Sequence, residues 1–417
     1  MNGAQQGKRR KDIPRGLGQN GPVLFSYGFR PFFSGAALWA IIGMAVWIAA
    51  LAGRAEVAVA YGSVAWHAHE MLFGFAAAVL TGYLMTSVPN WSGHFPVSGW
   101  PLALLFALWC VGRAALAMSD VMGVAPAIAL DATFLPVVAL LCGREIVSGH
   151  KWKDLRLVSI LAVLSIANIA FHAAVLTETE TGPSSRLAVA LYTALITMVG
   201  GRMVPSFTRT ALKARGGGPL PAPFGAVDRL AIALTLPALA GWVLLPESRL
   251  TAVLALMAAA AQTTRVVRWH GWRVGGDPIA LSLHAAYIFI PLGLAGISLA
   301  ALGEVPESAA LHGLTVGAIG GMMLSVMMRA TRGHTGKAVR GSWVSALASG
   351  ALFAAALLRP LAGFLPDQAP VLYALAGIGW IVAFGLFAIE YGPMLAFARR
   401  TPLRGQSSCA PTRINMR

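Results

Sequence analysis

The sequence consists mostly of apolar runs of about 20 residues, long enough for a helix to cross the hydrocarbon core of a bilayer. Of its 417 residues 57% are hydrophobic and only 12% are charged, and its mean hydropathy is +0.68. These values predict an all-α polytopic membrane protein. About twelve transmembrane helices are expected, at residues 30–52, 66–88, 100–118, 124–143, 155–177, 186–205, 227–245, 248–267, 279–301, 309–329, 342–363 and 371–396.

The basic residues test this count, because Lys and Arg collect in loops on the cytoplasmic side. They occupy alternate loops: Lys8, Arg9, Arg10, Lys11 and Arg15 before the first span, Arg144, Lys151 and Lys153 after the fourth, Arg209, Lys213 and Arg215 after the sixth, Arg268 and Arg273 after the eighth, Arg332, Lys337 and Arg340 after the tenth, and Arg399, Arg400 and Arg404 after the last. The other loops are acidic, with Glu56, Asp120, Glu178, Glu180, Glu247, Glu304, Glu307 and Asp367. Both termini are therefore predicted to be cytoplasmic.

Three parts follow from this topology: a basic cytoplasmic N-terminal tail at 1–23, one transmembrane domain at 24–398 and a cytoplasmic C-terminal tail at 399–417. The net charge of +16 is spread over separate loops, so it indicates membrane orientation and no nucleic-acid partner. The three cysteines form neither a CxxC pair nor a CxxCH site, so any haem would be held without a covalent bond.

The second, sixth and tenth spans end in similar sequences, at 88–93, 204–209 and 326–331. Successive similarities are four spans apart, as expected for three four-helix units with pseudo-threefold symmetry. The alternative is that proline and polar residues simply mark helix ends at the membrane interface.

Histidines near one membrane face are the main candidates for chemistry. Trp66-His67-Ala68-His69-Glu70 opens the second span, His312 opens the tenth, and His172 lies late in the fifth, so all four imidazoles are expected near the outer interface. Ionisable groups at membrane depth are costly and need partners, and a metal or haem iron would serve two imidazoles. The alternative is that these histidines bond to the backbone or relay protons in a secondary transporter.

The spacing within this motif limits how it can bind. Residues i and i+2 project about 200° apart on a helix, so His67 and His69 either serve two sites or precede the helix. One imidazole could then ligate a haem and the other a copper. Glu70 could orient the imidazole of His67 or bind the metal itself, and Asn168, one turn before His172, could act similarly.

A second group of histidines, His284, His334 and His94, is expected near the cytoplasmic face, where it could hold a second haem or metal. Arg30, Arg202 and Arg329 lie at the same level and could pair with haem propionates, or extend toward lipid phosphates. Arg113 and Asp131 fall at similar depth in adjacent spans and are expected to neutralise one another as a structural pair.

Several long motifs together resemble the NnrS family: FSYGFRPFF at 25–33, WHAHEMLFGF at 66–75, VPNWSG at 88–93, GGRMVPSFTR at 200–209 and LHGLTVGAIGGMMLSVMMRATRGHTG at 311–336. The resemblance implies a multi-pass protein of the bacterial inner membrane that contains haem b and copper and acts in nitric oxide metabolism, nitrosative-stress resistance or denitrification. It implies His67, His69, His172, His284, His312 and His334 as candidate metal ligands. Trp66 and Glu70 of the histidine motif, together with Arg30, Arg202 and Arg329, are the further candidate cofactor contacts. At the position of His94 the family is expected to have arginine.

The resemblance names no catalytic residue and no electron donor. If the protein is an enzyme, it implies an oxidoreductase acting on nitric oxide or a nitrosyl species. A non-catalytic nitric oxide sensor or scavenger, and the secondary transporter, remain alternatives. About twelve spans with histidines on the second and tenth also resemble the catalytic subunit of haem-copper oxidases, but the sixth span here has no histidine, so a copper site built as in those oxidases is not supported.

Overall fold

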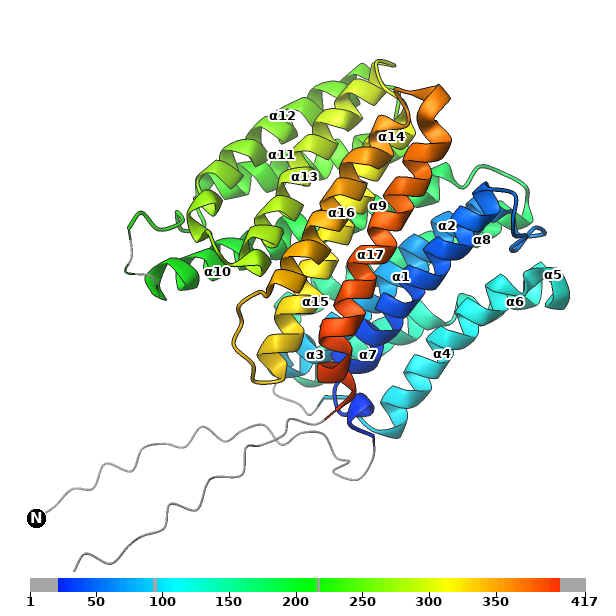
Figure 1. The fold of residues 1–417 in the computed structure, drawn as a ribbon, viewed down its shortest axis with the longest axis horizontal. Helices are drawn as coiled ribbons and strands as arrows, with labels where there is room; N and C mark the ends of the chain where they lie inside the picture. Colours follow the sequence, from blue (N-terminus) through cyan, green and yellow to red (C-terminus); the bar gives the residue numbers. More distant parts are fainter. Residues whose placement is uncertain (1–21, 93–95, 215, 217, 398–417) are drawn as a thin grey trace, which may run out of the picture.

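The computed structural model describes residues 22–92, 96–214, 216 and 218–397 (Figure 1). Within these residues the chain is helical and has no strand, and twelve helices are long and apolar enough to cross a membrane. The expected all-α architecture with twelve spans is therefore confirmed. His94, the C-terminal tail and residues 1–21 of the N-terminal tail lie outside the described residues.

The helices follow the predicted spans closely. Their bounds are α1 Phe29–Leu51, α2 Ser63–His69, η2 Glu70–Phe75, α3 Ala76–Ser92, α4 Trp100–Ala117, α5 Ser119–Met122, α6 Val124–Asp131, α7 Phe134–Ser148, α8 Leu155–Leu176, α9 Gly182–Leu195, η4 Ile196–Gly200, α10 Gly201–Ala214, α11 Ala226–Leu244, α12 Arg249–Val267, α13 Pro278–Ala301, α14 Glu307–His312, η6 Gly313–Gly320, α15 Gly321–His334, α16 Trp343–Leu361 and α17 Ala369–Ala396. Short 3₁₀ turns, η1 Val23–Phe25, η3 Trp152–Asp154, η5 Gly271–Val274 and η7 Pro366–Gln368, connect or precede them.

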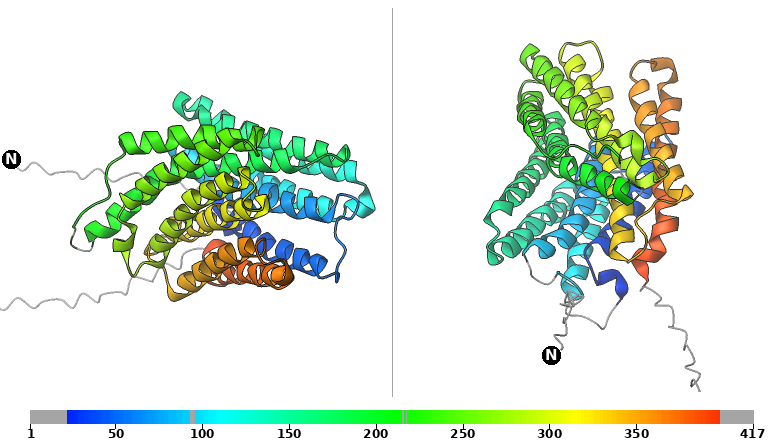
Figure 2. Two further views of the ribbon diagram at one scale, coloured as in Figure 1. Left: turned by 90° about the horizontal axis from the view of Figure 1, so that it is seen from above. Right: turned by 90° about the vertical axis from the view of Figure 1, so that its left-hand side faces the viewer.

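The chain proceeds around the bundle from α1 through the green helices to α17, which returns to lie beside α1 (Figure 2). Arg30 at the start of α1 donates a 2.7 Å hydrogen bond to the carbonyl of Leu395 at the end of α17. Trp380 donates a 3.1 Å bond to the carbonyl of Ala40. We call the end of the bundle where α1 begins and α17 ends the terminus-bearing end, and the other the opposite end.

Three spans share a local irregularity. The second, sixth and tenth spans are each interrupted by a π-helical segment, η2, η4 and η6. These spans are also among the most buried, since 78%, 61% and 67% of their most apolar windows are buried, against 33–39% for every other described span except the ninth. They are the spans whose ends resemble one another in sequence, although the threefold symmetry itself stays a prediction.

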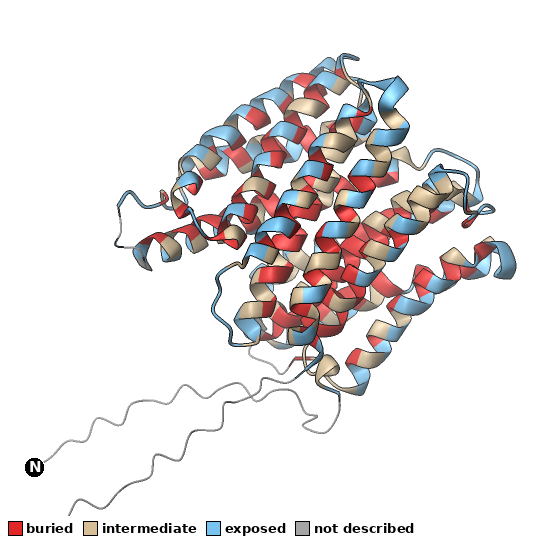
Figure 3. Ribbon diagram, viewed as in Figure 1, coloured by how far each residue is buried: buried red, intermediate tan, exposed pale blue. Residues whose placement is uncertain are grey.

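The outer helices expose apolar side chains along the faces turned away from the bundle (Figure 3). Leu140 on α7 and Ile389 on α17 are 73% and 74% exposed. In water such a surface would promote aggregation, whereas lipid chains cover it at no cost. The surface and the twelve apolar helices together indicate a bilayer as the protein's environment.

Candidate metal site and adjoining cavity

The second span starts at the opposite end of the bundle with a short regular helix, α2, that carries both histidines of the WHAHE motif. Because α2 is regular, His67 and His69 project in different directions. His69 turns into a buried polar cluster, and His67 turns into a cavity that it shares with His312. The expectation that the two imidazoles face different surroundings is confirmed.

The buried cluster brings together His69, Asp131 and His172 from α2, α6 and α8. Asp131 Oδ2 lies 3.2 Å from His69 Nε2 and 2.9 Å from His172 Nε2. Two ligands about 2.1 Å from one metal ion, at the angles found in tetrahedral or octahedral sites, lie about 3.0–3.4 Å apart. The three side chains are buried, and their ligand atoms all lie within 4.8 Å of one another. The cluster can therefore hold a metal ion through two imidazoles and a carboxylate.

Further groups orient the two imidazoles from behind. The hydroxyl of Tyr61 lies 2.9 Å from His172 Nδ1. Glu70 Oε1 lies 3.5 Å from His69 Nδ1, too long for a hydrogen bond, and neither atom has another hydrogen-bond partner. When Nδ1 of His172 donates to the Tyr61 hydroxyl, the lone pair of Nε2 is left for a metal, as is usual for a ligating histidine. Asn168 Oδ1 lies 2.8 Å from His69 Nε2, the nitrogen that also faces Asp131. Because an amide oxygen only accepts, Nε2 carries the proton in this contact, and a metal bound to Nε2 would replace that proton. Asn168 therefore contacts His69 rather than His172.

Arg113 joins the two carboxylates of the cluster. Its guanidinium donates to Glu70 Oε2 at 2.6 Å and also to Asp131 Oδ1, which confirms the expected Arg113–Asp131 pair. Trp39 Nε1 donates to the same Glu70 oxygen at 2.6 Å. With neutral histidines, two carboxylates and one guanidinium leave one excess negative charge in a buried site. Buried charge needs compensation, so this site favours a bound cation.

The structure changes two expectations for this region. Asp131 is more than the partner of Arg113, because its second oxygen lies between the two imidazoles. Glu70 faces His69, Arg113 and Trp39, and does not orient the imidazole of His67. Depth along the spans indicated the Arg113 pair, but the rotation of each helix about its axis decides what else Asp131 touches.

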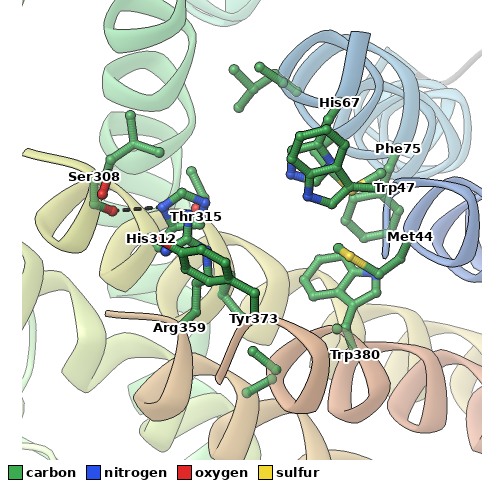
Figure 4. A pocket seen from close by; sticks show the side chains of 18 of the residues that line it. Met44, Trp47, His67, Phe75, Ser308, His312, Thr315, Arg359, Tyr373 and Trp380 are labelled. Atoms are coloured by element: carbon green, nitrogen blue, oxygen red, sulfur yellow. Dashed lines mark hydrogen bonds between the residues drawn. The ribbon is translucent and has the colours of Figure 1, made fainter. Parts of the chain in front are cut away.

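The cavity has a volume of about 350 Å³ and lies between α1, the second span, the tenth span, α16 and α17 (Figure 4). Its walls are mainly apolar and aromatic, as is typical of cofactor pockets, and include Trp47, Phe75 and Trp380. His67 and His312 project into it from different sides (Figure 4).

Both imidazoles are available to a ligand in this cavity. His312 Nδ1 donates a 2.6 Å hydrogen bond to the carbonyl of Ser308, so Nε2 carries no proton when the ring is neutral and its lone pair is available. His67 stacks on Trp47, with ring centroids 4.4 Å apart and an interplanar angle of 8°. The buried Nδ1 of His67 has no hydrogen-bond partner. The His67 ring lines the cavity and makes no hydrogen bond through this atom, so its hydrogen-bonding capacity is left unsatisfied at the cavity wall.

One charged group in the cavity was not anticipated from the sequence. Arg359, late in α16, lines it, and its guanidinium lies 4.2 Å from the centre of the Tyr373 ring. The sequence did contain one signal for it. Arg359 lies at the end of its span that faces the acidic loops, where the positive-inside rule places few cations.

The other predicted site residues lie elsewhere. Trp66 is buried next to Trp39 and does not line the cavity. His284 Nε2 pairs with Thr208 Oγ1 at 2.7 Å, and His334 is exposed. Among the described residues neither of these histidines joins a cluster of three potential metal ligands.

The three predicted arginines also have other contacts, toward the terminus-bearing end. Arg30 caps the end of α17, while Arg202 and Arg329 lie over the rings of Phe224 and Phe207. None of the three lines the cavity. Their role as cofactor contacts stays a prediction.

Comparison with known proteins agrees with the motifs. The sequence model of the NnrS family, described as NnrS protein, matches residues 23–399. No curated protein matches the chain. Because the family match covers nearly the whole chain, including both histidine sites, the protein belongs to the NnrS family.

Proposed function

We propose that this protein binds haem b in the cavity between His67 and His312, binds copper at His69, Asp131 and His172, and handles nitric oxide or its iron complexes by redox chemistry at these centres. The proposal places it in the bacterial inner membrane, in nitrosative-stress resistance or denitrification. The observation that carries it is the divergence of His67 and His69, which serve two different sets of partners from one helix.

The cavity supports haem in three respects. It presents two imidazoles from different sides, those of His67 and His312, which would hold the haem iron. Its walls are aromatic and apolar, as a porphyrin ring requires. The hydrogen bond from His312 Nδ1 to Ser308 leaves Nε2 as the ligating atom.

The donor set at the buried cluster supports a transition metal. Imidazole suits copper, iron and zinc alike, and two histidines with one carboxylate are also the ligands of many non-haem iron sites. Copper is proposed because the NnrS family is associated with it. Haem iron and copper(I) both bind nitric oxide, and this supplies the link between the two sites and the function.

Metal analysis and optical spectra of the purified full-length protein test the proposal. The wild type is expected to show a Soret band and about one copper per chain. His67→Ala and His312→Ala are expected to lose the Soret band and keep copper, whereas His69→Ala, His172→Ala and Asp131→Asn lose copper and keep the band. His150→Ala, at an exposed position, is the matched control and should change neither.

The alternatives give different results. A colourless, metal-free protein with intact fold would contradict the proposal and favour a transporter with titratable histidines. Iron in place of copper at the second site would contradict the copper assignment alone. Spectral shifts with nitric oxide but no nitrous oxide in anaerobic assays with a chemical reductant would favour a sensor or scavenger.

A further inference from the structure

Arg359 is the cationic group of the cavity, and its charge is not balanced there. Its Nη1 atom is buried and has no hydrogen-bond partner. None of the ion pairs found among the described residues includes it. Its contacts are with Tyr373, whose ring centre lies 4.2 Å from the guanidinium and whose side chain also hydrogen-bonds to it.

This arrangement is costly without a further partner. A guanidinium inside a membrane-spanning bundle needs an anion, because neither lipid chains nor aromatic rings replace its lost hydration. Within the cavity the other polar side chains are two imidazoles and neutral hydroxyls, none of which supplies a negative charge. An anionic group on the occupant of the cavity would supply it.

We propose that Arg359 anchors a carboxylate of the molecule that occupies this cavity. The proposal rests on the proposed function and deepens it: the occupant is a flat apolar ligand whose carboxylates, the haem propionates, point toward Arg359 and Tyr373 at the opposite end of the bundle. Arginine suits this role, since its fork of N–H groups matches a carboxylate in a bidentate pair. Arg30, Arg202 and Arg329, which were predicted from the sequence, lie toward the terminus-bearing end, so binding to them would orient the carboxylates in the opposite direction.

The test separates the carboxylate contact from iron ligation. Full-length apoprotein, produced in haem-limited cells and held in nanodiscs, is titrated with haem b and with its dimethyl ester, in which both carboxylates are masked, and binding is followed at the Soret band. The wild type is expected to bind haem b about tenfold more tightly than the ester, a difference of about 1.4 kcal/mol. Arg359→Gln is expected to lose this preference and to bind the ester as the wild type does.

Two further variants sharpen the test. Arg359→Lys keeps the charge and is expected to retain part of the preference. Arg156→Gln, which removes an exposed arginine on α8, is the matched control and should retain all of it. Unchanged binding of the ester shows that a variant is still folded around the cavity.

Each negative result would contradict a different part of the proposal. If Arg359→Gln still prefers haem b tenfold, the anchor is wrong while the haem site stands. If the preference is lost in Arg329→Gln instead, the carboxylates face the terminus-bearing end and the inference is overturned. If His67→Ala and His312→Ala bind haem b and its ester as the wild type does, or if the wild type binds neither, the proposed function itself fails.

Discussion

At the scale of single residues, the imidazole of His172 is held from both sides. Its Nε2 faces Asp131 at 2.9 Å, and its Nδ1 faces the hydroxyl of Tyr61 at 2.9 Å. Burial raises the pKa of Tyr61, so the hydroxyl keeps its proton at neutral pH and can donate or accept. A group in this position sets which nitrogen of the ring is available to a metal.

Tyr61→Phe removes only this oxygen, so it tests the orienting role directly. We expect metal affinity at the buried site to fall about 10–100-fold, the usual cost of losing a group behind a ligating histidine, with the Soret band unchanged. Copper titration against a competing chelator measures the affinity. Tyr27→Phe, near the other end of the bundle, is the control. Equal copper affinity in both variants would show that Tyr61 does not orient His172.

The same residues show how far sequence reasoning reaches at this scale. Helical spacing predicted the divergence of His67 and His69, and depth along the spans predicted the Arg113–Asp131 pair. Neither predicts how helices are rotated against one another. The pairing of Asp131 with two imidazoles and the position of Arg359 beside His312 depend on that rotation, and both were missed.

At the scale of elements, the close contact of the second span with α4 depends on one glycine. A methyl group added at Gly74 would overlap Arg113 Nη1 and would lie 2.6 Å from Glu70 Oε2. In the sequence Gly74 is followed at four-residue spacing by Ala78 and Gly82, and such a stripe of small residues is compatible either with a flat cofactor or with a neighbouring helix. In the structure it makes room for the ion pair that supports the metal site.

Gly74→Ala is therefore expected to destabilise the protein by about 1–3 kcal/mol, the usual cost of overpacking a core, and to lower copper occupancy. The apparent melting temperature in detergent and the copper content measure the two effects. Gly385→Ala on α17, where an added methyl group meets nothing within 4 Å, is the control and should melt like the wild type. Unchanged melting and copper content for Gly74→Ala would show that Arg113 and Glu70 can shift to accommodate the methyl group without loss of stability or copper.

The π-helical segments could not be predicted, because they depend on packing rather than on a local sequence signal. Two of the three begin directly after a candidate ligand: η2 follows His69, and η6 follows His312. Such segments often accompany functional sites, since they rotate the preceding turn relative to the rest of the helix. Here they allow the first turn of a span to present a ligand while the remainder keeps its packing in the bundle.

At the scale of the whole molecule, the twelve spans followed from apolar length alone, and the helices agree with them closely. The histidines expected near one face, His67, His69, His172 and His312, do lie toward the same end of the bundle. They lie in two sites, the first of the two alternatives that the spacing of His67 and His69 allowed, because α2 separates its two imidazoles. Orientation in the membrane rests on loop charge and stays a prediction.

The charge rule places the terminus-bearing end in the cytoplasm, so both candidate sites would lie toward the periplasm. Single cysteines in a background without Cys110, Cys142 and Cys409 test this prediction, because Glu180 and Lys337 are exposed at the two ends. With a membrane-impermeant maleimide, Glu180→Cys should react in cells whose outer membrane alone is permeabilised, whereas Lys337→Cys should react only after the inner membrane is opened. The reverse pattern would place the two sites near the cytoplasm, where metal and haem would reach them from the opposite side of the membrane.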